Sequence, residues 1–195
     1  MTEFDLILAS TSPFRKTILE KIQLPFTQAN PNCDETPLED ETPEKLVMRL
    51  ATNKAKSCQI NGHALIIGSD QVCVINGRII GKPHTTEKAI EQLTAASGQC
   101  ITFYTGLAIH NTKTNTSDVA LDIFKVHFRK LSQGQIKDYV QREQPLNCAG
   151  SFKSEGLGIA LFDRLEGKDP NSLIGLPLIT LIDMLKKQGI SVLGA

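Results

Sequence analysis

The stretch that decides the fold is Ala64-Leu-Ile-Ile-Gly-Ser-Asp-Gln71. Its first four residues are apolar and predict a buried strand, and Gly68 lets the backbone turn or approach another group closely. Three polar side chains follow before the chain becomes apolar again over 72–75. Because aspartate is rarely buried without a partner, Asp70 at a rigid strand end is a candidate for chemistry. The alternative is an ordinary turn, since Gly-Ser-Asp is common turn composition.

Short apolar segments on both sides of this stretch predict further strands. Residues 6–9 and 24–29 precede it, and Asn76-Gly77 predicts a tight hairpin between 72–75 and 78–80. The other expected strands are 100–110 and 119–128, joined as an antiparallel pair, and 156–162.

Capping residues mark the starts of the expected helices. Ser12 followed by Pro13 and Thr42 followed by Pro43 predict helix starts, and Ser132 with Gln135 matches a capping box. The expected helices are 14–22, 43–58, 86–96, 133–142 and 177–188, with a turn at 167–172 and Gly189 ending the last helix. Because strands alternate with helices and hairpins are present, we expect an α/β fold with a mixed twisted sheet and flanking helices.

Composition limits the class of protein. The 195 residues include 21 basic and 21 acidic ones, so the formal net charge is zero and stable nucleic-acid binding is not expected. The length fits a single domain over 1–195, and we expect neither a signal peptide nor a membrane-spanning segment. The five cysteines are scattered without a C-x-x-C pair, which argues against zinc and disulfides and favours the cytoplasm.

Charged residues near the ends of elements indicate an anion site. Arg15 near a helix start opposes the helix dipole, which is explained if an anion binds there with the free backbone N–H groups. A solvated basic face is the alternative. Residues 30–42 form an acidic loop, and we expect most of its carboxylates to be solvated.

Further cations lie at element ends or in loops and can be grouped with two acids. Lys54, Lys82 and Lys153 together with Glu35 and Asp70 suit a polyphosphate held with Mg²⁺. The chain has no P-loop, no complete dinucleotide fingerprint and no G-x-S-x-G elbow, and its four histidines lack metal-ligand spacing.

An ordered set of short motifs is more specific than this group of charges. In chain order the motifs are Leu8-Ala-Ser-Thr-Ser-Pro-Phe-Arg15, Asp34-Glu35, Lys54-Ala55, Gly68-Ser-Asp70, Gly81-Lys-Pro83, Thr105-Gly106 and Ala149-Gly150. Over about residues 6–185 the series resembles the Maf family of nucleoside triphosphate pyrophosphatases. The resemblance implies an ITPase-like fold with two lobes around a cleft, often a homodimer, and hydrolysis of a nucleotide between its α- and β-phosphates.

Three segments look like the branch of that family that hydrolyses N7-methyl-GTP to N7-methyl-GMP and diphosphate, which removes modified nucleotides from the pool. They are 68–71, 149–156 and 166–170. Phe14 stands where that branch typically has Trp, so the aromatic face is smaller. The alternatives are a dTTP/UTP pyrophosphatase of the same family and a non-catalytic nucleotide-binding regulator of cell division, while zero net charge disfavours an RNA-binding module.

The residues and the resemblance together assign expected roles. Asp70 is the general base, and Glu35 is the main ligand of a divalent metal, Mg²⁺ or Mn²⁺, that Asp70 shares. The expected substrate-binding residues are Ser10, Phe14, Arg15, Lys54, Gln71, Lys82, Lys153 and Glu155. The substrate is a small-molecule nucleotide.

Overall fold

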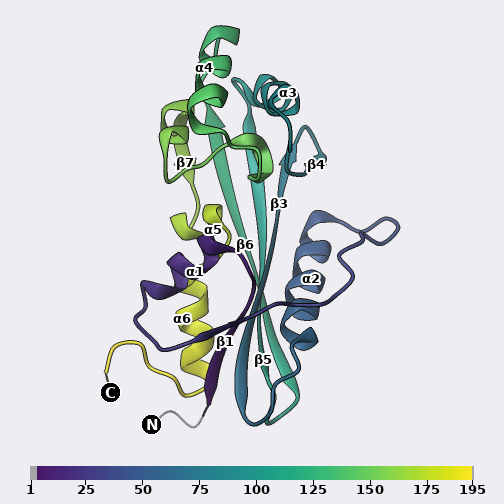
Figure 1. The fold of residues 1–195 in the computed structure, drawn as a ribbon, viewed down its shortest axis with the longest axis vertical. Coiled ribbons are helices and arrows are strands. Elements are labelled where there is room, and N and C mark those ends of the chain that lie inside the picture. The colour runs from purple at the N-terminus through teal and green to yellow at the C-terminus, as the bar shows by residue number, and fades with distance from the viewer. Residues whose placement is uncertain (1–3, 195) are drawn as a thin grey trace. The chain divides into compact units, whose positions relative to one another are not determined.

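The computed structural model describes residues 4–194 and arranges their strands in a mixed sheet (Figure 1). Within these residues the sheet has seven strands, in the order β2-β1-β3-β5-β6-β7, with β4 paired to β3. β1 (Asp5–Ala9) runs parallel to both β2 (Thr27–Ala29) and β3 (Ala64–Ile75), whereas β4 (Arg78–Ile80) is antiparallel to β3. The predicted mixed sheet with flanking helices is therefore confirmed.

The remaining strands follow one another along the chain and in the sheet. β5 (Cys100–Asn111) and β6 (Thr116–Phe128) are neighbours. The N–H of Phe128, at the end of β6, donates to the carbonyl of Gln99, just before β5. The two strands therefore run antiparallel, as expected. β7 (Phe162–Glu166) pairs antiparallel with β6 at the edge of the sheet.

The chain divides into two compact units, and the boundaries fall inside the three long strands. Unit 1 comprises residues 1–71, 105–122 and 169–195, and unit 2 comprises residues 72–104 and 123–168. β3, β5 and β6 each contribute one part to each unit. The single domain expected over the whole chain stays a prediction.

Unit 1 has helices on both faces of its part of the sheet (Figure 1). α2 (Pro43–Ser57) covers one face. α1 (Pro13–Glu20), α5 (Pro170–Ile174) and α6 (Leu178–Lys187) cover the other face.

Two apolar cores result from the alternation of side chains along the strands. Leu65 and Ile67 of β3 pack with α1 and α6, whereas Ala64 and Ile66 pack with α2. Because successive strand residues point to opposite faces, the same alternation directs Asp70 to the face that α2 covers.

Two glycines let α2 lie directly on the backbone of the sheet. A Cβ added at Gly68 would lie 2.0 Å from the carbonyl oxygen of Ala51, and one at Gly106 would lie 2.1 Å from that of Val47. No side chain fits at either position. The close approach that Gly68 allows is therefore to a helix of the same unit.

Unit 2 contains four helices and a cluster of aromatic rings. The helices are α3 (Thr86–Ala96), α4 (Gln133–Glu143) and two short 3₁₀ helices, η1 (Ala149–Ser151) and η2 (Leu157–Leu161). Four phenylalanines meet edge to face with ring centroids 4.9–5.6 Å apart. They are Phe103, Phe128, Phe152 and Phe162.

Helix starts lie where the capping residues predicted them. Ser12 and Thr42 cap α1 and α2, and Ser132 with Gln135 forms the reciprocal capping box of α4. Gly189, with φ of 82°, follows the end of α6 in a Schellman motif. Within residues 4–194 no helix is long and apolar enough to cross a membrane.

Three local predictions differ from the structure. β3 continues through Asp70, which therefore lies inside a strand and not at a strand end. Residues 157–161 form a 3₁₀ helix, and the strand begins only at Phe162, because a short apolar run does not distinguish the two. The expected turn at 167–172 leads into α5, which Asp169 caps.

Candidate active site

Two carboxylates meet one buried ammonium group in unit 1. Lys54 Nζ, in α2, lies 2.6 Å from Asp70 Oδ1 and 3.1 Å from Glu35 Oε2. The side chains of Lys54 and Asp70 are 8% and 11% exposed, whereas that of Glu35 is 57% exposed. A nearly buried ammonium and carboxylate thus compensate each other, and Glu35 reaches the same cation from a more exposed position.

Local structure explains why the Lys54–Asp70 pair is buried. Asp70 lies on the strand face that α2 covers, and Gly68 lets that helix approach the strand closely. Lys54 lies between Ala51 and Ala55 in α2, and none of these three positions is more than 6% exposed. The stem of the lysine is therefore enclosed while its ammonium group reaches the carboxylate.

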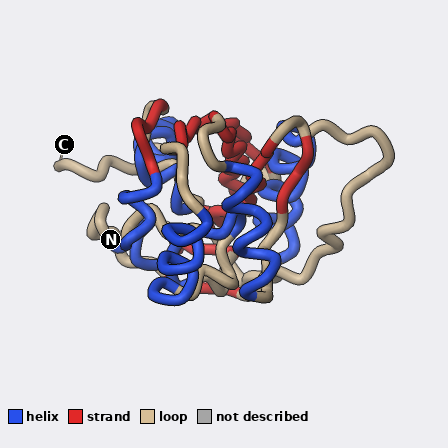
Figure 2. The backbone as a smooth tube through the Cα atoms, turned by 90° about the horizontal axis from the view of Figure 1, so that it is seen from above, coloured by secondary structure: helices blue, strands red, loops and turns tan. Residues whose placement is uncertain are grey.

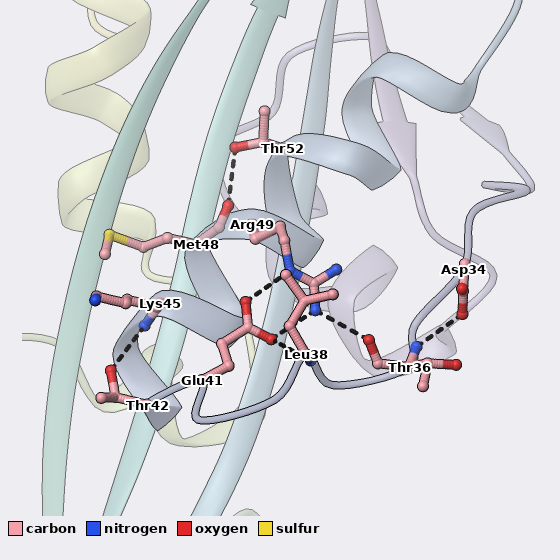
Figure 3. A network of polar contacts seen from close by, with 9 residues as sticks. All are labelled: Asp34, Thr36, Leu38, Glu41, Thr42, Lys45, Met48, Arg49 and Thr52. Carbon is pink, nitrogen blue, oxygen red and sulfur yellow. Dashed lines mark hydrogen bonds and ion pairs between the residues drawn. The ribbon is translucent and has the colours of Figure 1, made fainter.

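The loop that carries Glu35 is anchored to α2 by one arginine (Figure 3). Arg49 Nε donates to Glu41 Oε1 at 2.6 Å, and its Nη2 donates to Glu41 Oε2 at 2.7 Å and to the carbonyl of Thr36 at 3.1 Å. This pairing lowers the pKa of Glu41 to about 2. Figure 2 shows the loop as the long tan segment between β2 and α2. Solvation, which we expected for most of the loop's carboxylates, does not apply to Glu41.

Arg15 brings a second positive charge near the cluster. Its backbone N–H donates to the cap Ser12 Oγ, and its Nε donates to the carbonyl of Gly175 at 2.9 Å. Burial lowers the pKa of Arg15, while the charges of Asp70 and Glu35 raise it. The guanidinium stays protonated, because arginine is not deprotonated in proteins.

The other residues at the start of α1 have different surroundings. Ser10 is buried, and its Oγ accepts a hydrogen bond from the N–H of Ser12 at 3.2 Å. Lys16 pairs with Glu20 at 3.8 Å, and both side chains are half exposed, so Lys16 belongs to a solvated face. Phe14 is 39% exposed. Its ring is therefore accessible to a ligand.

Gln71 lies on the other face of β3 from Asp70. Its Nε2 donates to Thr105 Oγ1 at 2.9 Å and to the carbonyl oxygen of Ser172, in α5. Strand alternation explains the separation, because neighbouring side chains point to opposite faces. The structure thus brings Asp70 together with Lys54. The amide nitrogen of Gln71 instead donates its hydrogen bonds to Thr105 and Ser172 on the opposite face of β3.

Three of the expected substrate residues belong to unit 2. Lys153 Nζ lies 3.2 Å from Glu143 Oε1 and donates to the carbonyl of Glu143 at 2.8 Å, at the end of α4. Lys82 and Glu155 are exposed. Burial raises the pKa of the Cys148 thiol, and the charges of Glu155, Lys153 and Lys82 all act on this group. Within unit 2 the charges of the three residues therefore all act on one thiol.

The donor set of the cluster fits a divalent cation that arrives with a ligand. Glu35 and Asp70 supply two carboxylates. The described part of the chain holds no group of three His, Cys, Asp or Glu side chains able to bind a metal. Mg²⁺ is commonly held by one or two carboxylates plus substrate phosphates and water. Glu35 and Asp70 suit that arrangement as the protein ligands.

Sequence patterns did not assign a role to three residues that support the cluster. Arg49 pairs with Glu41 eight positions away, and no local pattern predicts that pairing. Thr105 belonged to a family motif without an assigned function. Asp169 followed by Pro170 does match an N-cap and N1 pair, which is a signal that indicates α5.

Known proteins match this chain in sequence over nearly its whole length. A family model described as Maf-like protein matches residues 5–188. A 7-methyl-GTP pyrophosphatase of Vibrio vulnificus (strain CMCP6) is 65% identical over 194 residues, covering 100% of both chains. Proteins of the same name from Vibrio cholerae and Aliivibrio fischeri are 64% and 65% identical, over 99% and 96% of this chain and 100% and 98% of theirs. Among solved structures, a HAM1 protein from Coxiella burnetii aligns with a TM-score of 0.48 and 15% identity, over 78% of this chain and 88% of that one.

Proposed function

Because the chain belongs to the Maf family, we propose that it is a nucleotide pyrophosphatase, a hydrolase of phosphorus-containing anhydrides, that acts on N7-methyl-GTP. It cleaves between the α- and β-phosphates and releases N7-methyl-GMP and diphosphate. Relatives that are 65%, 64% and 61% identical to the chain carry the name of this activity. Such a reaction removes modified nucleotides from the pool.

The observation that carries this proposal is the convergence of Asp70 and Glu35 on Lys54. Lys54 engages Oδ1 of Asp70 at 2.6 Å, whereas Oδ2 has no hydrogen-bond partner among residues 4–194. Oδ2 is therefore the atom that accepts a proton from an attacking water molecule. A general base must lie within hydrogen-bond reach of that water, and the fixed Lys54 contact orients the carboxylate for it.

The cations of the site bind and neutralise the phosphates. Lys54 and Arg15 offset the charge that develops on phosphate oxygens, and the first turn of α1, with Ser10 beside it, offers the backbone N–H of Phe14. Lys82 is proposed as a further phosphate ligand. Bound Mg²⁺ or Mn²⁺ supplies Lewis acidity toward phosphate oxygens and acidifies its water. Glu35 would be the main protein ligand of that ion, and Asp70 would share it.

The cellular setting is part of the proposal. All five cysteines are free thiols, which suits a reducing compartment. We therefore place the enzyme in the cytoplasm, where its nucleotide substrates are. The homodimer that the family resemblance implies stays a prediction. Light scattering of the purified protein measures the molar mass and so tests it.

Asp70→Asn tests the proposal most directly. The amide keeps the shape of the side chain but does not accept a proton, so we expect kcat to fall by about 10²–10⁴-fold, the usual contribution of a general base. Turnover of N7-methyl-GTP, dTTP and UTP is followed by chromatography of all products. Asp163→Asn, at an exposed position of β7, is the matched control and should keep full activity.

The products separate this function from its alternatives. Nucleoside diphosphate with orthophosphate, or near wild-type turnover by Asp70→Asn, would contradict the proposed reaction. A preference for dTTP and UTP would show that the protein is instead a dTTP/UTP pyrophosphatase of the same family. Nucleotide binding without any turnover would favour the non-catalytic regulator.

A further inference from the structure

The face of β3 opposite the Asp70 side chain is hydrogen-bonded to one short segment of unit 1. We call residues Asp169–Gly175, which comprise α5 and its two caps, the anchor segment. The hydroxyl of Ser69, which is fully buried, donates toward the carbonyls of Gly175 at 2.9 Å and Gly106 at 3.0 Å. The chain is thus bound to this segment immediately before Asp70.

The chain is bound to the same segment immediately after Asp70. Gln71 Nε2 donates to the carbonyl of Ser172 and to Thr105 Oγ1, and Thr105 Oγ1 itself donates to the carbonyl of Ser172 at 3.2 Å. Thr105 is fully buried. Its hydroxyl therefore links β5, β3 and the anchor segment through one atom.

The anchor segment is itself held firmly. The carboxylate of Asp169 is fully buried, and its Oδ1 accepts hydrogen bonds from the N–H and the Nδ2 of Asn171 at 2.8 and 2.7 Å. Its Oδ2 accepts a hydrogen bond from the N–H of Ile179 at 2.8 Å, so Asp169 joins the starts of α5 and α6. A buried carboxylate with three donors is well satisfied.

The segment also holds the cation next to the carboxylates. Its last carbonyl, that of Gly175, accepts the hydrogen bond from Arg15 Nε at 2.9 Å. Gly175 has φ of 113°, which favours glycine, and a Cβ there would lie 3.4 Å from Arg15 Nε. Ser69, Gln71 and Arg15 therefore share one support.

We propose that the anchor segment positions Asp70 through Thr105 and Arg15 through the carbonyl of Gly175, with Thr105 as a positioning residue for the reaction. The proposal rests on the proposed function. Side chains of a strand alternate between its two faces. Hydrogen bonds that fix Ser69 and Gln71 on one face therefore also fix the direction in which the side chain of Asp70 points on the other face. A displacement of about 1 Å in a reacting group is enough to lower a rate by about 10²-fold.

The test compares Thr105→Val with Thr105→Ser. Valine keeps the shape and removes both hydrogen bonds, so we expect kcat for N7-methyl-GTP to fall by about tenfold to a hundredfold with KM changed less than about threefold. Serine keeps the hydroxyl and should restore kcat. Ser172→Ala is the matched control, since its hydroxyl is buried without a partner among residues 4–194, and it should leave kcat unchanged.

Amide hydrogen exchange provides a second measurement that does not depend on turnover. In Thr105→Val the amides of 69–71 should exchange faster than in Thr105→Ser, with the amide of Ile66, in the core of the same strand, as the internal reference. If Thr105→Val does not fold, Gln71→Leu removes the same link at a less buried position and is measured in its place.

The outcomes separate the positioning role from its alternatives. Thr105→Val with wild-type kcat, or with unchanged exchange at 69–71, would overturn the proposal. A loss confined to N7-methyl-GTP and absent with UTP would also overturn it, because Gln71 would then act on the base. If the wild-type protein turned over no nucleotide, the proposed function would fail, and the exchange comparison alone would decide whether Thr105 holds this part of β3.

Discussion

Lys54 shows how a single residue connects the stability of unit 1 to its chemistry. Its ammonium group lies 2.6 Å from Asp70 and 3.1 Å from Glu35, and its side chain is only 8% exposed. Without phosphate, this cation is what compensates the nearly buried Asp70. If a polyphosphate binds as proposed, the same cation would be shared between the carboxylates and the phosphate oxygens.

Lys54→Met should lower the free energy of unfolding by about 3–5 kcal/mol, because it leaves the carboxylate of Asp70 buried without its partner. Lys56→Met, two positions along α2 at an exposed site, is the control and should change stability by less than about 0.5 kcal/mol. Urea denaturation measures both. Equal stability of Lys54→Met and wild type would show that Asp70 does not depend on this ammonium group.

Phe14 carries a prediction about the base. N7-methylguanine is cationic, and a cation on an aromatic face is worth about 0.5–2 kcal/mol, or roughly two- to thirtyfold in affinity. Phe14→Ala should therefore lower kcat/KM for N7-methyl-GTP more than for UTP, and Phe14→Trp should keep or raise the preference. Glu155→Ala should act in the same direction as Phe14→Ala, because it removes the carboxylate that we propose as the partner of the base N–H groups. Equal losses of kcat/KM on both nucleotides would show that these residues support the fold or bind the phosphates and do not recognise the base.

At the scale of elements, the loop between β2 and α2 is held by one ion pair. Arg49 binds both oxygens of Glu41 and the carbonyl of Thr36, and so connects the loop that carries Glu35 to the helix that carries Lys54 (Figure 3). The side chain of Glu41 is 6% exposed and that of Arg49 is 24% exposed. This contact sets where Glu35 lies.

Glu41→Gln gives a pH-dependent prediction. The pKa of Glu41 is lowered from 4.5 to about 2, mainly by its hydrogen bonds to Arg49. Its stabilising contribution is therefore fully present above about pH 4.5 and is lost as the pH falls toward about 2. Glu41→Gln should be less stable than wild type at pH 7, and the difference should shrink across that acid range.

Unfolding curves at several pH values measure this difference, and Glu39→Gln, at an exposed position of the same loop, is the control. A difference between wild type and Glu41→Gln that stayed constant from pH 7 to pH 2 would show that the carboxylate charge does not stabilise the loop.

At the scale of the whole molecule, the prediction concerns the metal. Because the cluster offers two carboxylates, Mg²⁺ should bind weakly to the protein alone and more tightly with a non-hydrolysable nucleotide analogue. Calorimetry measures both affinities, and Glu35→Gln should weaken the second. A chelator should stop turnover of N7-methyl-GTP, and added Mg²⁺ or Mn²⁺ should restore it. Full activity in excess chelator would contradict a metal-dependent reaction.

Local signals predicted elements whose formation depends on nearby residues. The helix starts at Ser12 and Thr42, the capping box at Ser132 and the hairpin at Asn76-Gly77 are in place, since caps and turns require only a few adjacent groups. The same holds for the mixed sheet, which follows from the order of the segments. Asp70 and Glu35 lie beside Lys54, with which they were grouped as charges suited to a polyphosphate, and their roles in a site stay predictions.

Local sequence patterns did not predict the pairings between residues that lie far apart in the chain. No periodicity predicts that Arg49 binds Glu41, that Gln71 and Ser69 bind the anchor segment, or that Lys153 binds Glu143. The continuation of β3 through Asp70 was missed for the same reason. Polar residues end a strand when they need water, and here each polar side chain finds a partner on its own face of the sheet.

By itself the sequence determined the α/β class, most element positions and the family, because these depend on composition, periodicity and short ordered motifs. Only the tertiary structure decided the surroundings of each charge. Asp70 faces Lys54 while its neighbours face the anchor segment, because α2 and α5 cover opposite faces of one strand. That division follows from where helices pack on the sheet, which is set by contacts between residues far apart in the chain.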